Sequence, residues 1–196
     1  ERDLYFFHQE IPFSRLGVIY YTQMPQSLTN RFLEQSLQQK FQVAFSDVKG
    51  PNGQIDYFKS LQQIIDKIDA FYFTPLYGLT VPEITRFIAI LNQHEIPVYS
   101  GEGVELVEKG ALLTMDSHNS SVTPNPNARF YALQINKIVG GASPKDLSLN
   151  FEPGIIISVN MDTAEQIRKE PSLELLLRAN KISTKKAESA EQLMDL

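Results

Sequence analysis

Four short runs of apolar residues, each followed by a stretch with helical spacing, constrain the fold of this chain more than any other feature. The runs are LGVIYY, FQVAFSDV, AFYFTPL and IPVYS, and they begin at residues 16, 41, 70 and 96. Their content of β-branched and aromatic residues predicts strands that are buried on both faces. Strands of this kind that alternate with helices form a parallel sheet with right-handed crossovers. We therefore predict an α/β fold in which helices cover both faces of a parallel sheet, a three-layer sandwich.

The helix predicted over residues 80–95 has the clearest boundaries in the chain. Thr80 and Glu83 have the spacing of a capping box, and Pro82 lies in the first turn, where proline is tolerated. An apolar stripe follows at helical spacing and is assigned to the core: Ile84, Phe87, Ile88 and Leu91.

The second half of the chain continues with a less regular order of elements. A helix ending at two glycines is predicted over residues 128–140, with Gly140 as its left-handed stop. Its apolar face would consist of Ala128, Tyr131, Ala132, Ile135 and Ile138. The other predicted elements are a short helix in 103–110, strands over 111–116 and 154–160, and helices over 163–169 and 172–180.

Composition excludes several classes of protein. The 196 residues carry a net charge of −5, which disfavours non-specific nucleic-acid binding. There is no cysteine, so disulfides, thiolate metal sites and cysteine nucleophiles are excluded; this fits an extracytoplasmic bacterial protein. No run of 18 apolar residues is present. Residues 1–10 do not form a signal peptide, so we expect either that a leader was removed or that the chain is part of a longer one.

Ligands of an open parallel sheet bind outside the carboxyl ends of its strands. The residues there include Ser27, Tyr77, Glu102 and Asp116. Together they could hold a zwitterion, with Glu102 or Asp116 facing an ammonium group and helix amides facing a carboxylate. Each residue also has a structural interpretation that stays open: Ser27 as a helix cap, Tyr77 as a loop cover, and Asp116 as the cap of the following segment.

The motifs of common enzymes and cofactor sites are missing. Asp116 and His118 indicate a metal site only weakly, because no further histidine or cysteine is near them in sequence. The GEGVE stretch at 101–105 lacks the third glycine and the context of a dinucleotide loop. Neither a phosphate loop nor a G-x-S-x-G elbow occurs. We predict a protein that is not an enzyme and has no cofactor or metal.

The order of several stretches resembles a known family. LGVIYY followed by QS before a helix, IPVYSGEGVELVEKGALLTMD, ALQINKIVGGASPKDL and ISVNMDTAEQIRKEPSLELLLRANKI together are similar to the ABC transporter substrate-binding proteins of the periplasmic-binding protein type I fold. The resemblance spans residues 16–182, and GASPKDL after a helix is its strongest element. It implies two lobes, with the chain crossing between them, and only the C-terminal portion of such a protein.

The resemblance also implies how the chain divides into lobes and which residues bind the ligand. Residues 13–101 and 151–182 would form the main lobe, 102–150 a crossover segment of an incomplete second lobe, and 183–196 a polar tail. The family's Asn-Ser is Gln26-Ser27 here, and its acid after the third strand is lost at 74–77. The ligand-binding residues carried over are Tyr21, Ser27, Tyr77, Glu102 and Asp116.

Three functions are compatible with these observations. The first is the solute-binding component of a bacterial ABC importer, located in the periplasm or otherwise outside the cytoplasm. It would bind a small organic solute such as an amino acid. Its partners would be a permease and, in a homodimer, a second copy of the chain. The second is an extracytoplasmic sensor or interaction domain with lost or altered ligand binding. The third, a flavodoxin-like or isomerase-type enzyme, would need a flavin loop or an acid–base pair, and neither is visible.

Overall fold

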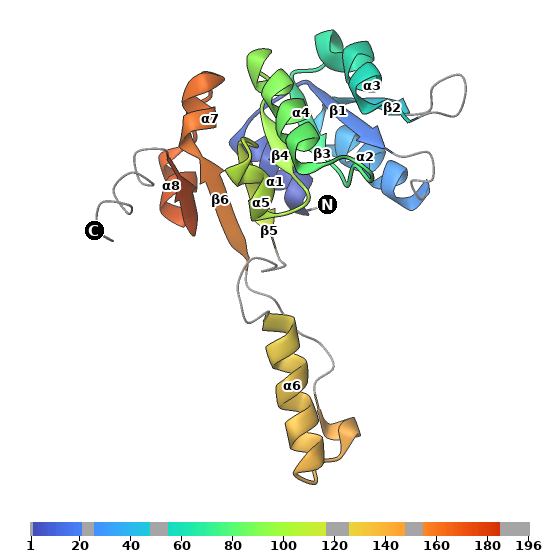
Figure 1. Cartoon of the computed structure of the whole chain (residues 1–196), viewed down its shortest axis with the longest axis vertical. Helices are drawn as coiled ribbons and strands as arrows, with labels where there is room; N and C mark the ends of the chain where they lie inside the picture. The colour runs from blue at the N-terminus through green and yellow to red at the C-terminus, as the bar shows by residue number, and fades with distance from the viewer. Residues whose placement is uncertain (1, 21–25, 48–54, 117–125, 148–154, 185–196) are drawn as a thin grey trace.

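One sheet with helices on both faces forms most of the molecule (Figure 1). The computed structural model describes residues 2–20, 26–47, 55–116, 126–147 and 155–184. Its strands are β1 (Arg15–Tyr20), β2 (Gln42–Asp47), β3 (Ala70–Phe73), β4 (Val98–Ser100), β5 (Leu113–Asp116), β6 (Ile156–Asn160) and β7 (Lys181–Ser183). Its helices are α1 (Arg2–Glu10), α2 (Gln26–Gln39), α3 (Tyr57–Ile64), α4 (Val81–Gln93), α5 (Val104–Glu108), α6 (Pro126–Val139), α7 (Met161–Gln166) and α8 (Leu173–Arg178), with 3₁₀ turns η1 (Ile65–Lys67) and η2 (Pro144–Asp146).

The four strands predicted in the first half of the chain pair in parallel, as expected. The strand order is β2-β1-β3-β4-β5-β6-β7, and the β1–β2, β1–β3, β3–β4 and β4–β5 pairs are all parallel. Tyr20 lies opposite Asp47, and Phe73 lies opposite Ser100. The carboxyl ends of these strands therefore share one edge of the sheet, which we call the tip edge.

The β5–β6 pair is antiparallel, which the sequence analysis did not predict. Asp116 lies opposite Ile156, and Leu113 lies opposite Val159. The chain thus leaves the sheet at the tip edge after β5 and re-enters it at the same edge. β7, also not predicted, then pairs in parallel with β6.

Buried apolar residues form one cluster on each face of the sheet. One cluster contains Phe7 of α1, Phe32 of α2 and Leu175 of α8. The other contains Leu61 of α3 and Val107 of α5, together with the α4 stripe. The predicted three-layer α/β architecture is therefore confirmed. We call the sheet with α1–α5, α7 and α8 the α/β body.

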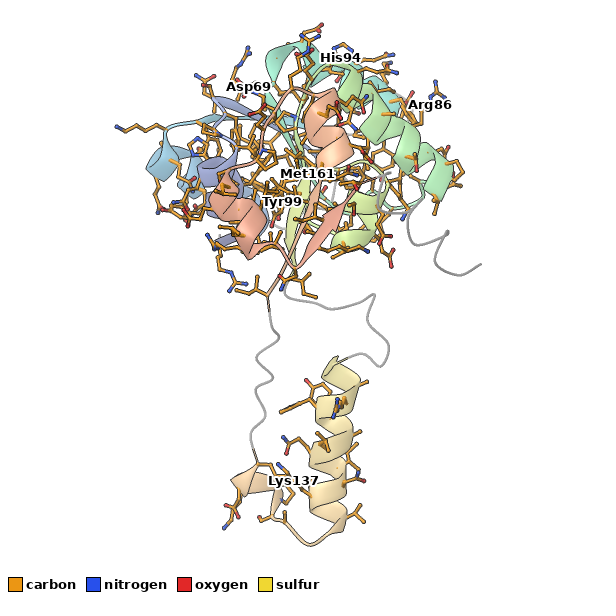
Figure 2. The ribbon with its side chains drawn as sticks, turned by 90° about the vertical axis from the view of Figure 1, so that its left-hand side faces the viewer. Asp69, Arg86, His94, Tyr99, Lys137 and Met161 are labelled. Carbon is orange, nitrogen blue, oxygen red and sulfur yellow. The ribbon has the colours of Figure 1, made fainter. Side chains whose placement is uncertain are left out.

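Residues 102–116 lie in this body and not in a second lobe. β5 is hydrogen-bonded between β4 and β6, and Leu112 and Leu113 are fully buried. Moving this strand to another lobe would expose both leucines, so the expectation for 111–116 is wrong. Only α6 and η2 stand apart from the body, as Figure 1 and the position of Lys137 in Figure 2 show. The remaining domain boundaries stay predictions.

The first helix, which the sequence analysis missed, belongs to the body as well. α1 buries Leu4, Phe6 and Phe7. The Phe7 ring lies 5.0 Å from Phe13 and 5.2 Å from Tyr99, measured between ring centroids. The body therefore begins before residue 13.

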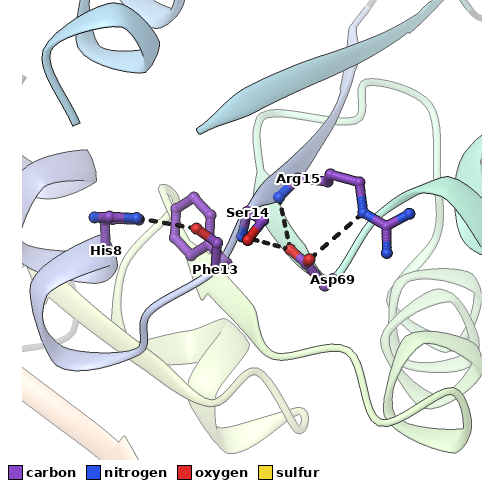
Figure 3. A network of polar contacts seen from close by, with 5 residues as sticks. All are labelled: His8, Phe13, Ser14, Arg15 and Asp69. Carbon is purple, nitrogen blue, oxygen red and sulfur yellow. Dashed lines mark hydrogen bonds and ion pairs between the residues drawn. The ribbon is translucent and has the colours of Figure 1, made fainter. Parts of the chain in front are cut away.

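A polar network at the edge opposite the tips joins β1 to β3 (Figure 3). The Asp69 carboxylate accepts hydrogen bonds from the backbone N–H groups of Ser14 (3.1 Å) and Arg15 (2.7 Å). It also pairs with the Arg15 guanidinium at 3.5 Å. His8 of α1 contacts the carbonyl oxygen of Phe13 at 3.0 Å. These contacts fix where β1 begins relative to its neighbours.

The ends of α4 and α6 follow the sequence closely. Thr80 caps α4, and both its backbone N–H and its hydroxyl donate to Glu83 Oε2, at 2.7 and 2.6 Å. These hydrogen bonds lower the pKa of the Glu83 carboxyl. α6 ends at Val139, and its left-handed stop lies one residue later than predicted, at Gly141 (φ +98°) rather than Gly140. The N–H of Ala142 then donates to the carbonyl of Lys137 at 2.9 Å.

Candidate functional site

The polar residues at the ends of β3 and β4 mostly support the backbone. The Thr74 hydroxyl donates to the carbonyl of Ile19 at 2.7 Å, and the Ser100 hydroxyl donates to that of Gly103 at 2.7 Å. The Thr114 hydroxyl donates to the carbonyl of Ser100 at 2.8 Å. All three side chains are buried. They therefore shape the tip edge, and their hydroxyl protons are already donated to backbone carbonyls.

Glu102 is the predicted site residue whose environment is most unusual. It lies in the loop between β4 and α5, where its N–H donates to Ser100 Oγ at 3.2 Å. Gly101 before it approaches the β3 backbone so closely that a Cβ would lie 2.8 Å from the carbonyl oxygen of Phe73. The Glu102 side chain reaches solvent, yet its partial burial raises the pKa of its carboxyl. A cation bound beside it would compensate for this loss of hydration.

Tyr77 is also available to a ligand. Its side chain is 70% exposed, in the loop between β3 and α4. Its carbonyl oxygen accepts a hydrogen bond from the Tyr57 hydroxyl at 2.8 Å, which fixes the backbone of the loop. The neighbouring Leu76, rather than Tyr77, covers the core at this point. A role of Tyr77 in ligand binding stays a prediction.

The other predicted site residues are described incompletely or lie outside the described residues. Tyr21 and His118 fall in the ranges 21–25 and 117–125, which the structure does not describe. Ser27 is in the first turn of α2, and Asp116 is the last residue of β5, but the side chain of neither is described. The structure thus places Glu102 and the backbone of Asp116 at the tip edge, and it does not test their roles.

A pair of stacked tyrosines behind the Glu102 loop was missed by the sequence analysis. The rings of Tyr72 and Tyr99 lie 5.1 Å apart at an angle of 21°. Tyr99 Oη accepts a hydrogen bond from the N–H of Met115 at 3.0 Å, and a Cβ on Gly101 would lie 3.2 Å from Tyr72 Oη. Burial raises the pKa of both phenols, so both stay protonated. Each tyrosine lies within a predicted strand, but which residue of one strand lies opposite which residue of the other cannot be read from the sequence.

A hollow of the body lies at the edge of the sheet opposite the predicted site. It has a volume of about 880 Å³ and is lined by α4, the end of α5, α7 and β7. We call it the α4–α7 groove. Asn160, the last residue of β6, lies on its lining; because β6 runs antiparallel to β5, its end is far from the tip edge.

The described ranges contain neither a metal-binding cluster of side chains nor a membrane-spanning helix. No group of three or more histidine, aspartate or glutamate side chains there is close enough together to bind a metal ion. None of the helices in those ranges is sufficiently long and apolar to cross a membrane.

Comparison with known proteins identifies the kind of fold. No family model and no curated protein matches the chain. Solved structures do match it, and they include substrate-binding proteins, so the chain has a fold of that kind: a mostly parallel sheet between helices.

Three of these structures illustrate the structural similarity. A conserved domain protein from Vibrio cholerae is 18% identical, with a TM-score of 0.67 over 92% of this chain and 58% of its own. An ABC domain in complex with L-Trp from Streptococcus pneumonia is 16% identical, with a TM-score of 0.67 over 93% of this chain and 59% of its own. A substrate binding protein with adhesive properties from Clostridium difficile, in its ligand-free, open structure, is 23% identical, with a TM-score of 0.65 over 93% of this chain and 59% of its own. The chain thus spans less than two thirds of the length of each.

Proposed function

We propose that this chain is a solute-binding module: the solute-binding component of an ABC-type importer, or the C-terminal part of one. The observation that carries the proposal is the shared edge of four parallel strands, β1–β4, with Glu102 and Tyr77 reaching solvent beside it. This is the edge of an α/β sheet at which ligands bind. The likeness of the fold to that of substrate-binding proteins supports a solute-binding function.

The groups at the tip edge fit a small zwitterion such as an amino acid. Glu102 offers a carboxylate whose raised pKa favours a cationic partner. α2 begins at the same edge with no acidic residue in its first turn, so its N-terminal amides can attract a carboxylate. Tyr21, Ser27 and Asp116 are proposed to complete the site, and Tyr77 to cover the solute.

Closure of two lobes around the solute would complete the mechanism. In this proposal a second lobe packs on α6, closes over the tip edge, and the closed form is recognised by a permease. The exposed apolar side chains of α6 support such a packing partner: Tyr131, Leu133, Ile135, Ile138 and Val139. The proposed location is extracytoplasmic, and no catalytic step is part of the function.

A thermal-shift screen of the chain tests this function. The panel contains the common amino acids and small organic acids, with L-tryptophan included because a structure of the same fold was determined with it. A solute at about 100 times its Kd stabilises a protein by about 2.7 kcal/mol, which raises the Tm of a chain of this size by about 5–10 °C. No rise with any solute would contradict the proposal.

Two pairs of variants locate the bound solute. Tyr77→Ala and Glu102→Gln should abolish most of the rise. Tyr5→Ala on α1 and Glu170→Gln beyond α7 replace exposed side chains of the same types outside the strand-end loops and should leave the rise unchanged. Equal effects in the members of either pair would argue against a site at the tip edge.

The second candidate is an extracytoplasmic sensor or interaction domain, and α6 is the observation that favours it. Val139 is 82% exposed and Ile135 is 59% exposed, and several exposed apolar side chains on one helix are typical of an interaction surface. If no solute binds, and if light scattering shows self-association that Ile135→Gln weakens, this second function replaces the first.

A further inference from the structure

The polar side chains on the floor of the α4–α7 groove donate hydrogen bonds to backbone carbonyls. Asn92 Nδ2 donates to the carbonyl oxygen of Gly110 at 3.0 Å, and Thr163 Oγ1 donates to the same oxygen at 3.0 Å. Asn160 Nδ2 donates to the carbonyl of Val107 at 2.7 Å, and its Oδ1 accepts from the N–H of Thr163 at 3.0 Å. On the α4 wall, the Thr85 hydroxyl donates to the carbonyl of Val81 at 3.0 Å.

What the floor still offers is acceptor capacity. Asn92 is 5% exposed, and its Oδ1 is buried without a hydrogen-bond partner. Turning the amide would place its oxygen against the carbonyl oxygen of Gly110, and two acceptors cannot bond to each other. The hydroxyl oxygens of Thr85 and Thr163 retain lone pairs after donating. A buried acceptor without a donor is costly, and a ligand that supplies one recovers that cost.

Charge on the rim favours the same kind of ligand. The lining contains three carboxylates, those of Glu108, Asp162 and Glu165, against the single ammonium of Lys109. Glu108 is paired with Lys181, and Lys109 Nζ donates to the carbonyl of Glu105 at 3.2 Å. Glu165 is exposed and forms no ion pair within the described ranges.

We propose that the α4–α7 groove binds a small organic cation with several N–H donors, an ammonium or guanidinium compound. The cation enters between α4 and α7, donates to Asn92 Oδ1 and the threonine oxygens, and lies against the carboxylate of Glu165. The volume of about 880 Å³ is within the range of small-molecule sites. Because the groove and the tip edge are at opposite edges of the sheet, this site is separate from the proposed solute site and does not depend on it.

The probes are 1,4-diaminobutane and agmatine, with 1,4-butanediol as an uncharged control of similar shape. Titrations are followed by NMR of the ¹⁵N-labelled chain at pH 7. We expect both cations to shift the Asn92 side-chain amide and the backbone amides of Gly110 and Thr163, while the diol shifts none of them. Equal shifts with the diol, or shifts confined to the Glu102 loop, would overturn the proposal.

Three variants test the contacts without entering the core. Glu165→Gln should weaken the Kd of 1,4-diaminobutane about threefold to fivefold, the range expected for one exposed charge contact. Glu170→Gln is the matched control, because Glu170 is exposed, lies beyond α7 and is not on the lining. Ala89→Lys places an ammonium of the chain itself on the lining and should prevent binding of the probe. Equal weakening by the two glutamate variants, or undiminished binding to Ala89→Lys, would show that the groove is not the site.

Discussion

The helices α4 and α6 are nearly equal in length, with 13 and 14 residues, yet their isoleucines have opposite environments. Ile88 of α4 is fully buried against the sheet, whereas Ile135 of α6 is 59% exposed. In the sequence both belong to apolar stripes at helical spacing. A stripe of this kind therefore predicts that a helix needs a partner surface, and it does not identify where that partner is.

The difference follows from what precedes and follows each helix. α4 connects the neighbouring parallel strands β3 and β4, so the crossover itself lays the helix on the sheet. α6 lies between β5 and β6, which are antiparallel and need no crossover helix. Nothing in the sheet topology brings α6 onto a face, and its apolar side chains stay exposed.

The largest difference in stability is expected between isoleucine-to-alanine substitutions in α4 and in α6. Ile88→Ala removes a fully buried side chain and should lower the free energy of unfolding by about 2–5 kcal/mol. Ile135→Ala should change it by less than about 0.5 kcal/mol. Urea denaturation followed by circular dichroism measures both. A similar loss in the two variants would mean that α6 is packed on the body after all.

A pair of glycines gives the next largest contrast. Gly110 precedes β5 with φ +108°, and a Cβ there would lie 3.3 Å from Asn92 Nδ2. Gly110→Ala should lower the free energy of unfolding by about 1–2 kcal/mol from backbone strain alone. Gly141 has φ +98° but open space around it. Gly141→Ala should strain only the end of α6 and leave the urea midpoint of the body unchanged; a shift of that midpoint would contradict the comparison.

The sequence was sufficient to predict the β1–β4 part of the body because its signals are local. The β1–β4 runs, the Thr80–Glu83 cap and the α4 stripe each determine structure within a few residues, and the parallel arrangement follows from the alternation of strands and helices. The antiparallel β6 was not predictable in this way, because its direction depends on where the chain travels after Asp116. α1 was missed because its three buried side chains, Leu4, Phe6 and Phe7, are too few to give a clear helical period.

The candidate site was less predictable than the fold. Thr74 and Ser100 are polar residues at strand ends, but their hydroxyls donate to backbone carbonyls, which no sequence pattern reveals. The tyrosine pair Tyr72 and Tyr99 depends on the β3–β4 register, which places the two residues opposite each other. The α4–α7 groove depends on four elements distant in sequence.

A smaller effect is expected at the caps of the two regions. Thr80 is hydrogen-bonded to Glu83 at the start of α4, and Thr80→Ala should lower the free energy of unfolding by about 1 kcal/mol. Ser143 precedes η2, beside α6, without a capping hydrogen bond from its side chain. Ser143→Ala should leave the same urea-denaturation midpoint where it is. If the two substitutions had equal effects, the cap on α4 would not contribute to the stability of the body.

Two carboxylates of the body should give the smallest effects, and these should have opposite signs. Hydrogen bonds from Thr80 lower the pKa of the Glu83 carboxyl below its ordinary 4.5. Ionised Glu83 therefore stabilises the fold above pH 4.5, and this contribution is lost as the pH falls through the lowered pKa. Burial raises the pKa of Glu102, so its ionised form is unfavourable once the pH rises through the raised value. At neutral pH Glu83→Gln should therefore be less stable than the unmodified chain and Glu102→Gln more stable. Both differences should shrink in acid, as thermal unfolding from pH 3 to pH 7 would show. A neutral-pH loss of stability in Glu102→Gln would mean that Glu102 supports the fold, and the tip edge would lose its best candidate for binding a cationic group.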